Sequence, residues 1–347
     1  GISATGHVGR ARRSLEAAGI VIAVYDRVRE NPTTRDVDAC LAVAKAAEVD
    51  LIVGFGGGSS LDTAKGCNFL LTNGGRMADY WGVGKATKPM FPMIAVPTTA
   101  GTGSECQSFA LIADEQTHQK MACGDPKAAP AVALLDPALT LTQPRQVTAC
   151  TGVDALAHAV ESFVSTRRTP LSMIYSRESF RLIVGNLSLV LEDPDDLIAR
   201  GATLLGASLA GVAIENSMLG AAHAAANPLT AHYGLPHGQA VAHVLPHVIR
   251  FNARQADVCN AYAELARDAR LSDSGDDWVA LRSLIQAIEK LIEAGGLHWT
   301  LAACEAHKRE IGMLAEEAAG QWTANFNPRE ATACEFADLY TVAWPVG

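Results

Sequence analysis

The sequence predicts two domains in one chain, an α/β domain over residues 1–145 followed by an all-helical domain over residues 146–347. Short apolar runs alternate with helical segments up to about residue 145, and strand-like runs are missing after it. A length of 347 residues suits two domains. Hydrophobic residues make up 49% and charged residues 19%, so the chain can bury a large core.

The first part alternates between the two kinds of element. Helical spacing over residues 10–18 ends at Gly19, a β-branched run over 20–25 predicts a strand, and residues 34–47 predict the next helix. Three wholly apolar runs predict further strands at 51–55, 94–96 and 132–135. Such runs are typical of parallel strands covered on both faces, so we expect a doubly wound sheet.

Helical periodicity dominates the second part. The predicted helices cover residues 152–165, 171–190, 195–213, 237–253, 278–294 and 308–320. We place the boundary between the two domains within residues 136–145, where Pro137 and Pro144 interrupt both patterns.

Charge and composition exclude several classes of protein. The net charge is −9, and an acidic surface repels phosphate backbones, so nucleic acid is not an expected partner. No secretory signal and no uninterrupted apolar run of membrane-spanning length occur, and the apolar stretch 204–226 predicts a buried helix pair. Because the chain begins with Gly1 rather than Met, we expect a truncated or processed form.

The eight cysteines are scattered and include no C-x-x-C pair. In a chain of this length such spacing indicates reduced thiols rather than a disulfide framework or a zinc knot. We therefore expect a cytoplasmic protein.

A glycine-rich loop follows the predicted strand 51–55. It comprises Gly56, Gly57, Gly58 and Ser59, and Asp62 falls in the first turn of the helix that follows. Glycines let the backbone approach a ligand closely, and a helix N-terminus suits a pyrophosphate. The alternative is an ordinary βα turn, because this loop is neither the common G-x-G-x-x-G fingerprint nor a Walker loop.

A second polar loop follows the strand 94–96 and carries Thr98, Thr99 and Thr102. Open α/β sheets bind ligands at the carboxyl ends of their strands. A threonine-rich turn that satisfies its own backbone is the alternative. Two such loops on successive strands together favour a dinucleotide site.

Four side chains of the helical part form a candidate metal site. Asp154 and His158 stand one helical turn apart, His223 lies among small residues, and His237 lies at the expected start of a helix. One Asp and three His leave coordination positions open, and mixed N/O ligands suit Fe²⁺, Zn²⁺, Co²⁺ or Mn²⁺.

Ordinary structural roles are the alternatives for these four residues. Thr151 and Asp154 have the spacing of a helix-capping device. A single histidine on an apolar helix face is more often a packing residue than a ligand. Three histidines and an aspartate within one half of the chain are harder to explain in that way.

These motifs resemble the iron-containing alcohol dehydrogenase family over nearly the whole chain. The resemblance is carried by the order and spacing of the segments from Asp26 to Thr33, 56–65, 97–105, 152–165 and 223–252. It implies a dehydroquinate synthase-like architecture, with an N-terminal dinucleotide-binding domain and a helical metal- and substrate-binding domain.

The resemblance also implies roles for individual residues. The matched metal ligands are Asp154, His158, His223 and His237, and the matched pyrophosphate-loop residues are Gly57, Gly58, Ser59 and Asp62. Thr98, Thr99 and Thr102 match the loop on the nicotinamide side, Lys120 matches a ribose-contacting lysine, and Asp26 is assigned to the cofactor site.

Two departures from the family pattern matter. Many members carry a histidine four residues after the third ligand, where this chain has Asn227. We assign catalytic roles to Asn227 and His237, with Asn227 binding the substrate or the carboxamide. The first strand of the family, whose acidic end distinguishes NAD from NADP, precedes Gly1. The sequence therefore does not choose between NAD and NADP.

The expected function is hydride transfer between a small alcohol or diol, or the matching aldehyde or ketone, and NAD or NADP, with Fe²⁺ or Zn²⁺ bound. A homodimer or larger homo-oligomer is expected. A metal-independent maleylacetate reductase-like enzyme, a dehydroquinate synthase-like lyase and a non-catalytic scaffold are the alternatives. The intact ligand set argues against the first and the last.

Overall fold

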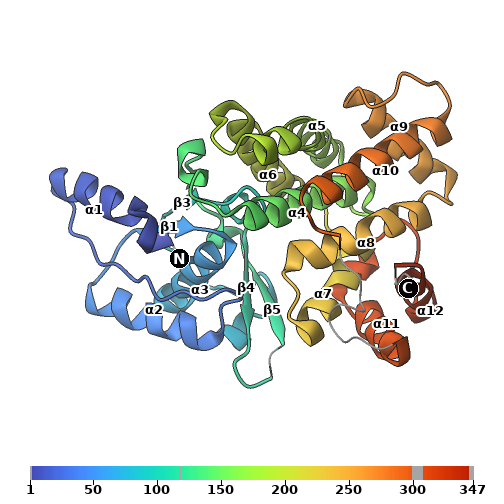
Figure 1. Ribbon diagram of the computed structural model, residues 1–347. Helices are drawn as coiled ribbons and strands as arrows, with labels where there is room; N and C mark the ends of the chain where they lie inside the picture. Colours follow the sequence, from blue (N-terminus) through green and yellow to red (C-terminus); the bar gives the residue numbers. More distant parts are fainter. Residues whose placement is uncertain (1, 118, 299–307, 344–347) are drawn as a thin grey trace. The chain divides into compact units, whose positions relative to one another are not determined.

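A computed structural model describes residues 2–117, 119–298 and 308–343 (Figure 1). The chain folds into two compact units. The N-terminal unit comprises Gly1–Thr99 and Ser104–Thr142, and the C-terminal unit comprises Ala100–Gly103 and Gln143–Gly347. The first is α/β and the second is helical, so the predicted fold class is confirmed.

A parallel three-stranded sheet carries the glycine-rich loop. Its strands are β1 (Ile52–Gly56), β3 (Met93–Pro97) and β6 (Val132–Ala133), in the order β1-β3-β6. Phe55 pairs with Val96, so β1 and β3 end at the same edge. Helix α3 (Gly58–Asn73) starts directly after β1 and places Leu61 and Ala64 over the sheet. The three strands predicted here are confirmed.

A second sheet in the same unit was not predicted. It joins β2 (Gly82–Val83), β5 (Lys120–Gly124) and β4 (Phe109–Ala113), and the β4–β5 pair is antiparallel. The two longer strands contain several alanines and few β-branched residues, which gives them a weak strand signal. Their inner side chains, including Ile112 and Met121, are fully buried in this unit's core.

The predicted strand over residues 20–25 is wrong. This segment carries no strand assignment, and Val21 is 97% exposed. A β-branched run becomes a strand only where a neighbour accepts its hydrogen bonds, and no described strand pairs with it. The flanking helices are α1 (His7–Ala17) and α2 (Thr34–Ala46), the second starting with a capping box between Thr33 and Asp36.

Nine α-helices make up the described part of the C-terminal unit. They are α4 (Arg145–Val164), α5 (Pro170–Glu192), α6 (Leu197–Glu215), α7 (Ala221–Tyr233), α8 (His237–Asn252), α9 (Ala256–Asp268), α10 (Asp277–Ala294), α11 (Ile311–Ala319) and α12 (Ala333–Ala343). All six predicted helices are present. Every residue from Gly152 to Val164 is buried, so α4 is the central helix of the unit.

Helix α6 is long and apolar enough to cross a membrane by length and composition alone. Inside this unit 61% of that stretch is buried. It packs closely on α5, because a Cβ added at Gly206 would lie 2.7 Å from Ile183. These features are typical of the core helix of a globular domain.

Candidate metal centre and nucleotide loops

Three acidic or imidazole side chains line one face of α4. Asp154, His158 and Glu161 stand at positions i, i+4 and i+7, and all three are buried. Thr151 lies inside this helix, where its hydroxyl donates to the carbonyl of Val147 at 2.8 Å. The capping interpretation of the Thr151–Asp154 spacing is therefore wrong.

The structure brings three imidazoles to one carboxylate oxygen. Asp154 Oδ1 lies 3.6 Å from Nε2 of His158, 3.3 Å from Nε2 of His223 and 3.7 Å from Nε2 of His237. Four ligands placed about 2.1 Å from one ion in tetrahedral geometry lie about 3.4 Å from one another. The three separations from Asp154 Oδ1 are close to that value.

The bonding inside this cluster also fits a bound cation. Asp154 Oδ1 and His223 Nε2 are buried and have no hydrogen-bond partner among the described residues. Buried polar atoms are seldom left unpaired in native proteins. One ligand atom each from Asp154, His223 and His237 falls within 4.8 Å of the others, which suits a metal ion. The residues therefore fit a divalent ion with O and N ligands.

The positions of His223 and His237 depend on the starts of two helices and on one glycine. His223 lies in the first turn of α7, and His237 is the first residue of α8. The next residue, Gly238, touches α4 so closely that an added Cβ would lie 2.1 Å from the carbonyl oxygen of Cys150. Only glycine permits this approach, which places His237 near Asp154.

Glu161 holds His223 in the orientation that a ligand needs. Its Oε2 lies 2.5 Å from His223 Nδ1, and its Oε1 accepts from the backbone N–H of Ala222 at 2.6 Å. Since a carboxylate only accepts, Nδ1 carries the proton and Nε2 faces Asp154. Glu161 is not among the site residues predicted from the sequence, although its spacing from Asp154 and His158 on one helix face was a usable signal.

Burial and neighbouring charges shift the pKa values of Asp154, His158 and His223 in different directions. Burial lowers the pKa of His158 to about 4. For Asp154 burial acts to raise the pKa, but the nearby imidazoles, His158 first, leave it below its ordinary value. For His223 burial acts to lower the pKa, but Glu161 and Asp154 raise it to about 9.

Asn227 lies one turn beyond His223 on α7. Its side-chain amide donates to Oε1 of Gln321 at 3.0 Å. An amide of this kind can orient a polar group but does not exchange a proton as an imidazole does. The position therefore differs in chemistry from the histidine that the family pattern favours.

The two loops of the N-terminal unit touch each other. Gly57 caps α3, and an added Cβ there would lie 3.2 Å from the methyl carbon of Thr99. The backbone N–H of Thr98 donates to the carbonyl of Gly56 at 3.0 Å. Gly58 and Ser59 form the first turn of α3, which leaves an open helix N-terminus.

A buried polar network supports these loops. The Ser104 hydroxyl donates to Asp62 Oδ1 at 2.7 Å, and the fully buried Lys65 ammonium donates to the Ser104 carbonyl at 2.6 Å and to the Phe109 carbonyl at 2.9 Å. Burial raises the pKa of Asp62. Asp62 thus connects the start of α3 to the loop after β3.

Three other predicted cofactor residues take no part in the hydrogen bonds described above. Thr102 belongs to the C-terminal unit. Lys120 is exposed at the start of β5. Asp26 is exposed, and no described contact joins it to the glycine loop.

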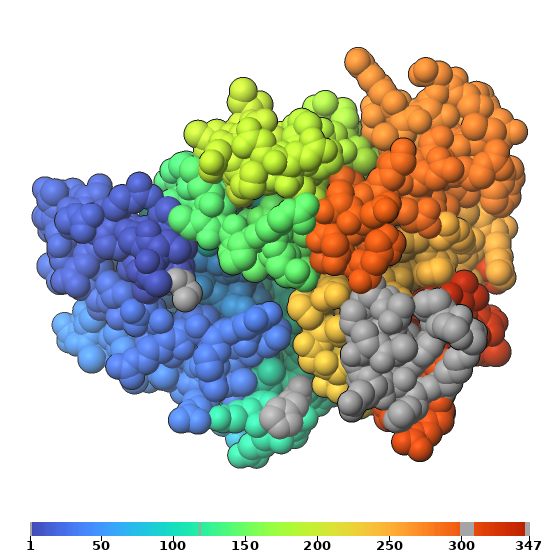
Figure 2. All heavy atoms as spheres, viewed as in Figure 1, coloured from blue at the N-terminus to red at the C-terminus, as the bar shows by residue number. Residues whose placement is uncertain are grey.

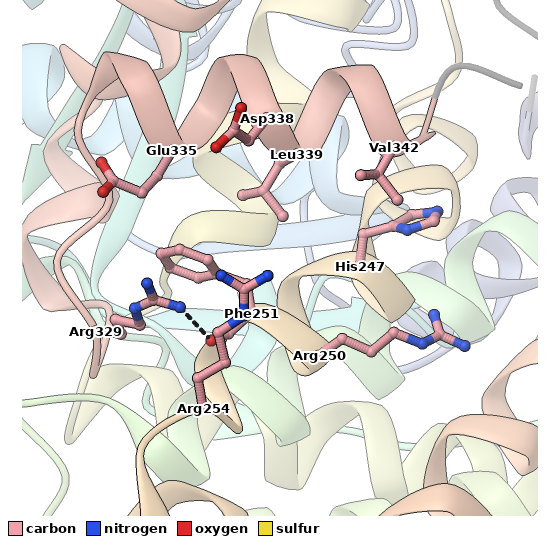
Figure 3. Close-up of a pocket in the computed structure, with 9 residues that line it drawn as sticks. All are labelled: His247, Arg250, Phe251, Arg254, Arg329, Glu335, Asp338, Leu339 and Val342. Atoms are coloured by element: carbon pink, nitrogen blue, oxygen red, sulfur yellow. Dashed lines mark hydrogen bonds between the residues drawn. The ribbon is translucent and has the colours of Figure 1, made fainter.

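A separate surface pocket of about 240 Å³ lies between α8 and α12 (Figure 3). Its charged lining includes Arg250, Arg254, Arg329, Glu335 and Asp338. None of the four candidate metal ligands lines it, so it is distinct from the metal cluster.

The fold and the Asp–His₃ cluster define a class, that of metal-dependent, nucleotide-linked oxidoreductases. Residues 1–137 match the family described as iron-containing alcohol dehydrogenase, and residues 148–344 match the C-terminal domain of the Fe-containing alcohol dehydrogenase family. The chain belongs to the iron-containing alcohol dehydrogenase family. Relatives of this chain include an NAD-dependent methanol dehydrogenase and a lactaldehyde reductase, which favours an alcohol dehydrogenase over the lyase alternative.

Named relatives are similar over different shares of the chain. Alcohol dehydrogenase 4 of Schizosaccharomyces pombe is 41% identical over 73% of this chain, and the match spans 60% of that relative's own length. NAD-dependent methanol dehydrogenase of Bacillus methanolicus is 32% identical over 97% of this chain and 88% of its own. A crystal structure of 1,3-propanediol oxidoreductase matches with a TM-score of 0.93 and 33% identity, over 98% of this chain and 88% of that one.

Proposed function

We propose that this chain transfers hydride between small alcohols or diols, or the matching aldehydes and ketones, and NAD or NADP. A divalent ion, Fe²⁺ or Zn²⁺, is held by Asp154, His158, His223 and His237. The observation that carries the proposal is the convergence of three imidazole Nε2 atoms within 3.3–3.7 Å of one buried carboxylate oxygen. Mixed N/O ligation leaves positions open for a substrate oxygen.

The chemistry divides between the bound groups and the chain. When bound, the ion supplies Lewis-acid stabilisation of negative charge on the substrate oxygen, and the nicotinamide exchanges the hydride. Asp154 brings a compensating negative charge to the cation. Glu161 fixes the tautomer of His223, so that no reorganisation of this ligand is needed.

We assign the substrate side of the cluster to His237. Its side chain is 30% exposed, whereas those of Asp154, His158 and His223 are 8% exposed or less. The cluster is therefore accessible beside His237. Asn227 is proposed to orient the substrate or the carboxamide through a second amide N–H, since one N–H binds Gln321.

The dinucleotide is proposed to bind at the loops after β1 and β3. The backbone amides of Gly57, Gly58 and Ser59 at the start of α3 suit the pyrophosphate, and Asp62 orders this turn through Ser104. The remaining proposed contacts are Thr98, Thr99 and Thr102 on the nicotinamide side and Lys120 toward the ribose, and Asp26 is a further proposed cofactor-binding residue.

Metal-resolved activity tests the proposal. The ion is stripped with a chelator, Fe²⁺ or Zn²⁺ is restored, and alcohols are scanned with NAD and with NADP. We expect no turnover without metal and recovery with one of the two ions. Full turnover of the stripped chain would instead favour the metal-independent, maleylacetate reductase-like alternative.

A ligand variant supplies a second test. His223→Ala is expected to abolish turnover while leaving the circular dichroism spectrum unchanged. The matched control is His232→Ala on the same helix, because that imidazole is partly exposed and paired with Glu317. Its turnover is expected to stay at the parent level.

Location and assembly complete the proposal. We infer a cytoplasmic enzyme, supported by seven free cysteines among the described residues; Cys304 lies outside them.

We also infer a homodimer or larger homo-oligomer, supported by exposed apolar side chains on α5 and α6, including Ile174 at 63% and Ile198 at 85%. These helices form the yellow-green surface in Figure 2. Light scattering on the purified chain tests the assembly.

A further inference from the structure

One segment of the C-terminal unit is bonded to the ends of two helices that carry candidate metal ligands. This 321–329 segment precedes α12. Its Phe326 carbonyl accepts from the backbone N–H of Thr166, two residues beyond the end of α4, at 2.9 Å. Arg329 donates to the Phe251 carbonyl in the last turn of α8 at 2.9 Å, and its guanidinium lies over the Phe251 ring (Figure 3). The segment is thus attached to the ends of α4 and α8.

The side chain of Asn327 caps the third ligand-bearing helix, α7, from the same segment. Its Oδ1 accepts from the backbone N–H of Ala221, the first residue of the helix, at 3.1 Å. The N-cap residue, Gly220, has no side chain with which to cap the helix itself. An added Cβ at Gly220 would lie 2.8 Å from Asn327 Oδ1 and 3.1 Å from Glu161 Oε1. The glycine therefore leaves room for two caps that come from elsewhere in the chain.

The groups around Asn327 fix the orientation of its amide. The backbone N–H of Ala221 can only donate to it, and the Arg329 carbonyl, 2.6 Å from Asn327 Nδ2, can only accept. Asn252, the last residue of α8, accepts from Asn327 Nδ2 at 2.7 Å and donates to Asn327 Oδ1 at 3.1 Å. Both asparagines are buried. All four hydrogen-bonding positions of the Asn327 amide are thus used, and they join the start of α7 to the end of α8.

The 321–329 segment contacts α7 at a second point. Gln321 accepts from the side-chain amide of Asn227 at 3.0 Å. His223 lies between the two points of attachment, Ala221 and Asn227. Attachment on both sides of His223 restricts the rotation of this part of the helix as well as its position.

We propose that Asn327 is a positioning residue of the metal centre, which holds the first turn of α7 so that His223 Nε2 meets the other ligands around one cation. This inference rests on the proposed metal-dependent function. Without Asn327, the buried N–H of Ala221 loses its acceptor, and a helix start without a cap is destabilised. Glu161 does not replace it, because its two oxygens already bind Ala222 and His223.

Calorimetric titration of the metal-free full chain with Zn²⁺ tests the inference. Asn327→Ala is expected to bind Zn²⁺ about tenfold more weakly, the loss typical when a group that orients a metal ligand is removed. Asn327→Asp loses both amide donors but keeps an acceptor for Ala221. It should therefore unfold at a lower urea concentration and still bind Zn²⁺ within about threefold of the parent. An equal loss of affinity in both variants would overturn the inference.

Two controls separate positioning from general stability. Ser179→Ala removes a buried hydrogen bond to the Gly206 carbonyl between α5 and α6, so it should lower the urea midpoint and leave the Zn²⁺ affinity at the parent level. Asn325→Ala changes an exposed amide of the 321–329 segment and should alter neither quantity. A weaker Zn²⁺ affinity in Ser179→Ala, as large as that in Asn327→Ala, would reduce Asn327 to a structural role.

Circular dichroism establishes that each variant is folded. If Asn327→Ala does not fold, Gly220→Ala takes its place, because the added methyl displaces the Asn327 cap and should weaken Zn²⁺ binding in the same way. Parent-like affinity in the folded variant would refute the positioning role alone. No Zn²⁺ binding by the parent chain would refute the proposed metal centre and this inference together.

Discussion

Replacing Glu161 by Gln should weaken metal binding without changing the size of any side chain. The carboxylate accepts two buried N–H groups, one from His223 Nδ1 at 2.5 Å and one from the backbone of Ala222 at 2.6 Å. The amide of glutamine offers a single acceptor oxygen, and its NH₂ group would face the other donor. One buried N–H therefore loses its partner, and the charge-assisted bond to the imidazole becomes a neutral one.

The expected size of the effect follows from these two contacts. Loss of a hydrogen-bonding partner of a metal-bound histidine typically costs 10–100-fold in metal affinity, about 1.4–2.7 kcal/mol. An unsatisfied buried N–H lowers the free energy of unfolding by about 1–3 kcal/mol. Both losses should be visible in the same variant.

Calorimetric titration of the metal-free chain with Zn²⁺ measures the affinity, and urea unfolding measures the stability. Glu178→Gln is the matched control, since Glu178 is exposed and pairs with Arg181 on the surface of α5. Its affinity and stability should stay close to those of the parent. If Glu161→Gln binds Zn²⁺ within twofold of the parent, the positioning role assigned to Glu161 is wrong.

Three further outcomes are expected. The pKa of His223 is raised to about 9 in the metal-free chain, so its proton must leave when the metal binds. The affinity for the metal should therefore rise about tenfold per pH unit between pH 6 and 8, and calorimetry in buffers of different ionisation enthalpy should detect the released proton. Gly238→Ala should lower the free energy of unfolding by about 1–3 kcal/mol and weaken metal binding, because the added methyl meets a carbonyl of α4 at 2.1 Å; Gly185→Ala, with open space around it, should stabilise by up to about 1 kcal/mol in the same urea titration. Ser104→Ala should raise the KM for NAD and lower the free energy of unfolding by about 1–3 kcal/mol, because the buried Asp62 carboxylate loses its hydroxyl donor. An unchanged KM would show that this network does not support the cofactor-binding loop.

The convergence of the four candidate metal ligands could be predicted in large part from the sequence, because the candidate site depends on residue type and spacing. Asp154 and His158 at i and i+4 required only helical geometry, and resemblance to a family linked them to His223 and His237. The carboxylate of Glu161 was less visible, because a glutamate on a helix is usually a surface residue. Its role follows from burial and from its contact with α7, which the sequence does not display.

The fold was predicted best where elements depend on local pattern. The apolar strands β1, β3 and β6 and the amphipathic helices of the C-terminal unit follow from periodicity. The error over residues 20–25 and the unforeseen β4–β5 hairpin have one cause, since pairing between distant strands decides both. Domain limits near residues 136–145 and the roles of individual cofactor residues stay predictions.

Anomalous X-ray diffraction from crystals of the metal-loaded enzyme, recorded at the absorption edge of the bound metal, tests the central claim most directly. We predict a single strong peak about 2.0–2.2 Å from one carboxylate oxygen of Asp154 and from one nitrogen each of His158, His223 and His237. Active enzyme without a peak at this position, or with a peak that two or more of these side chains do not reach, would contradict it.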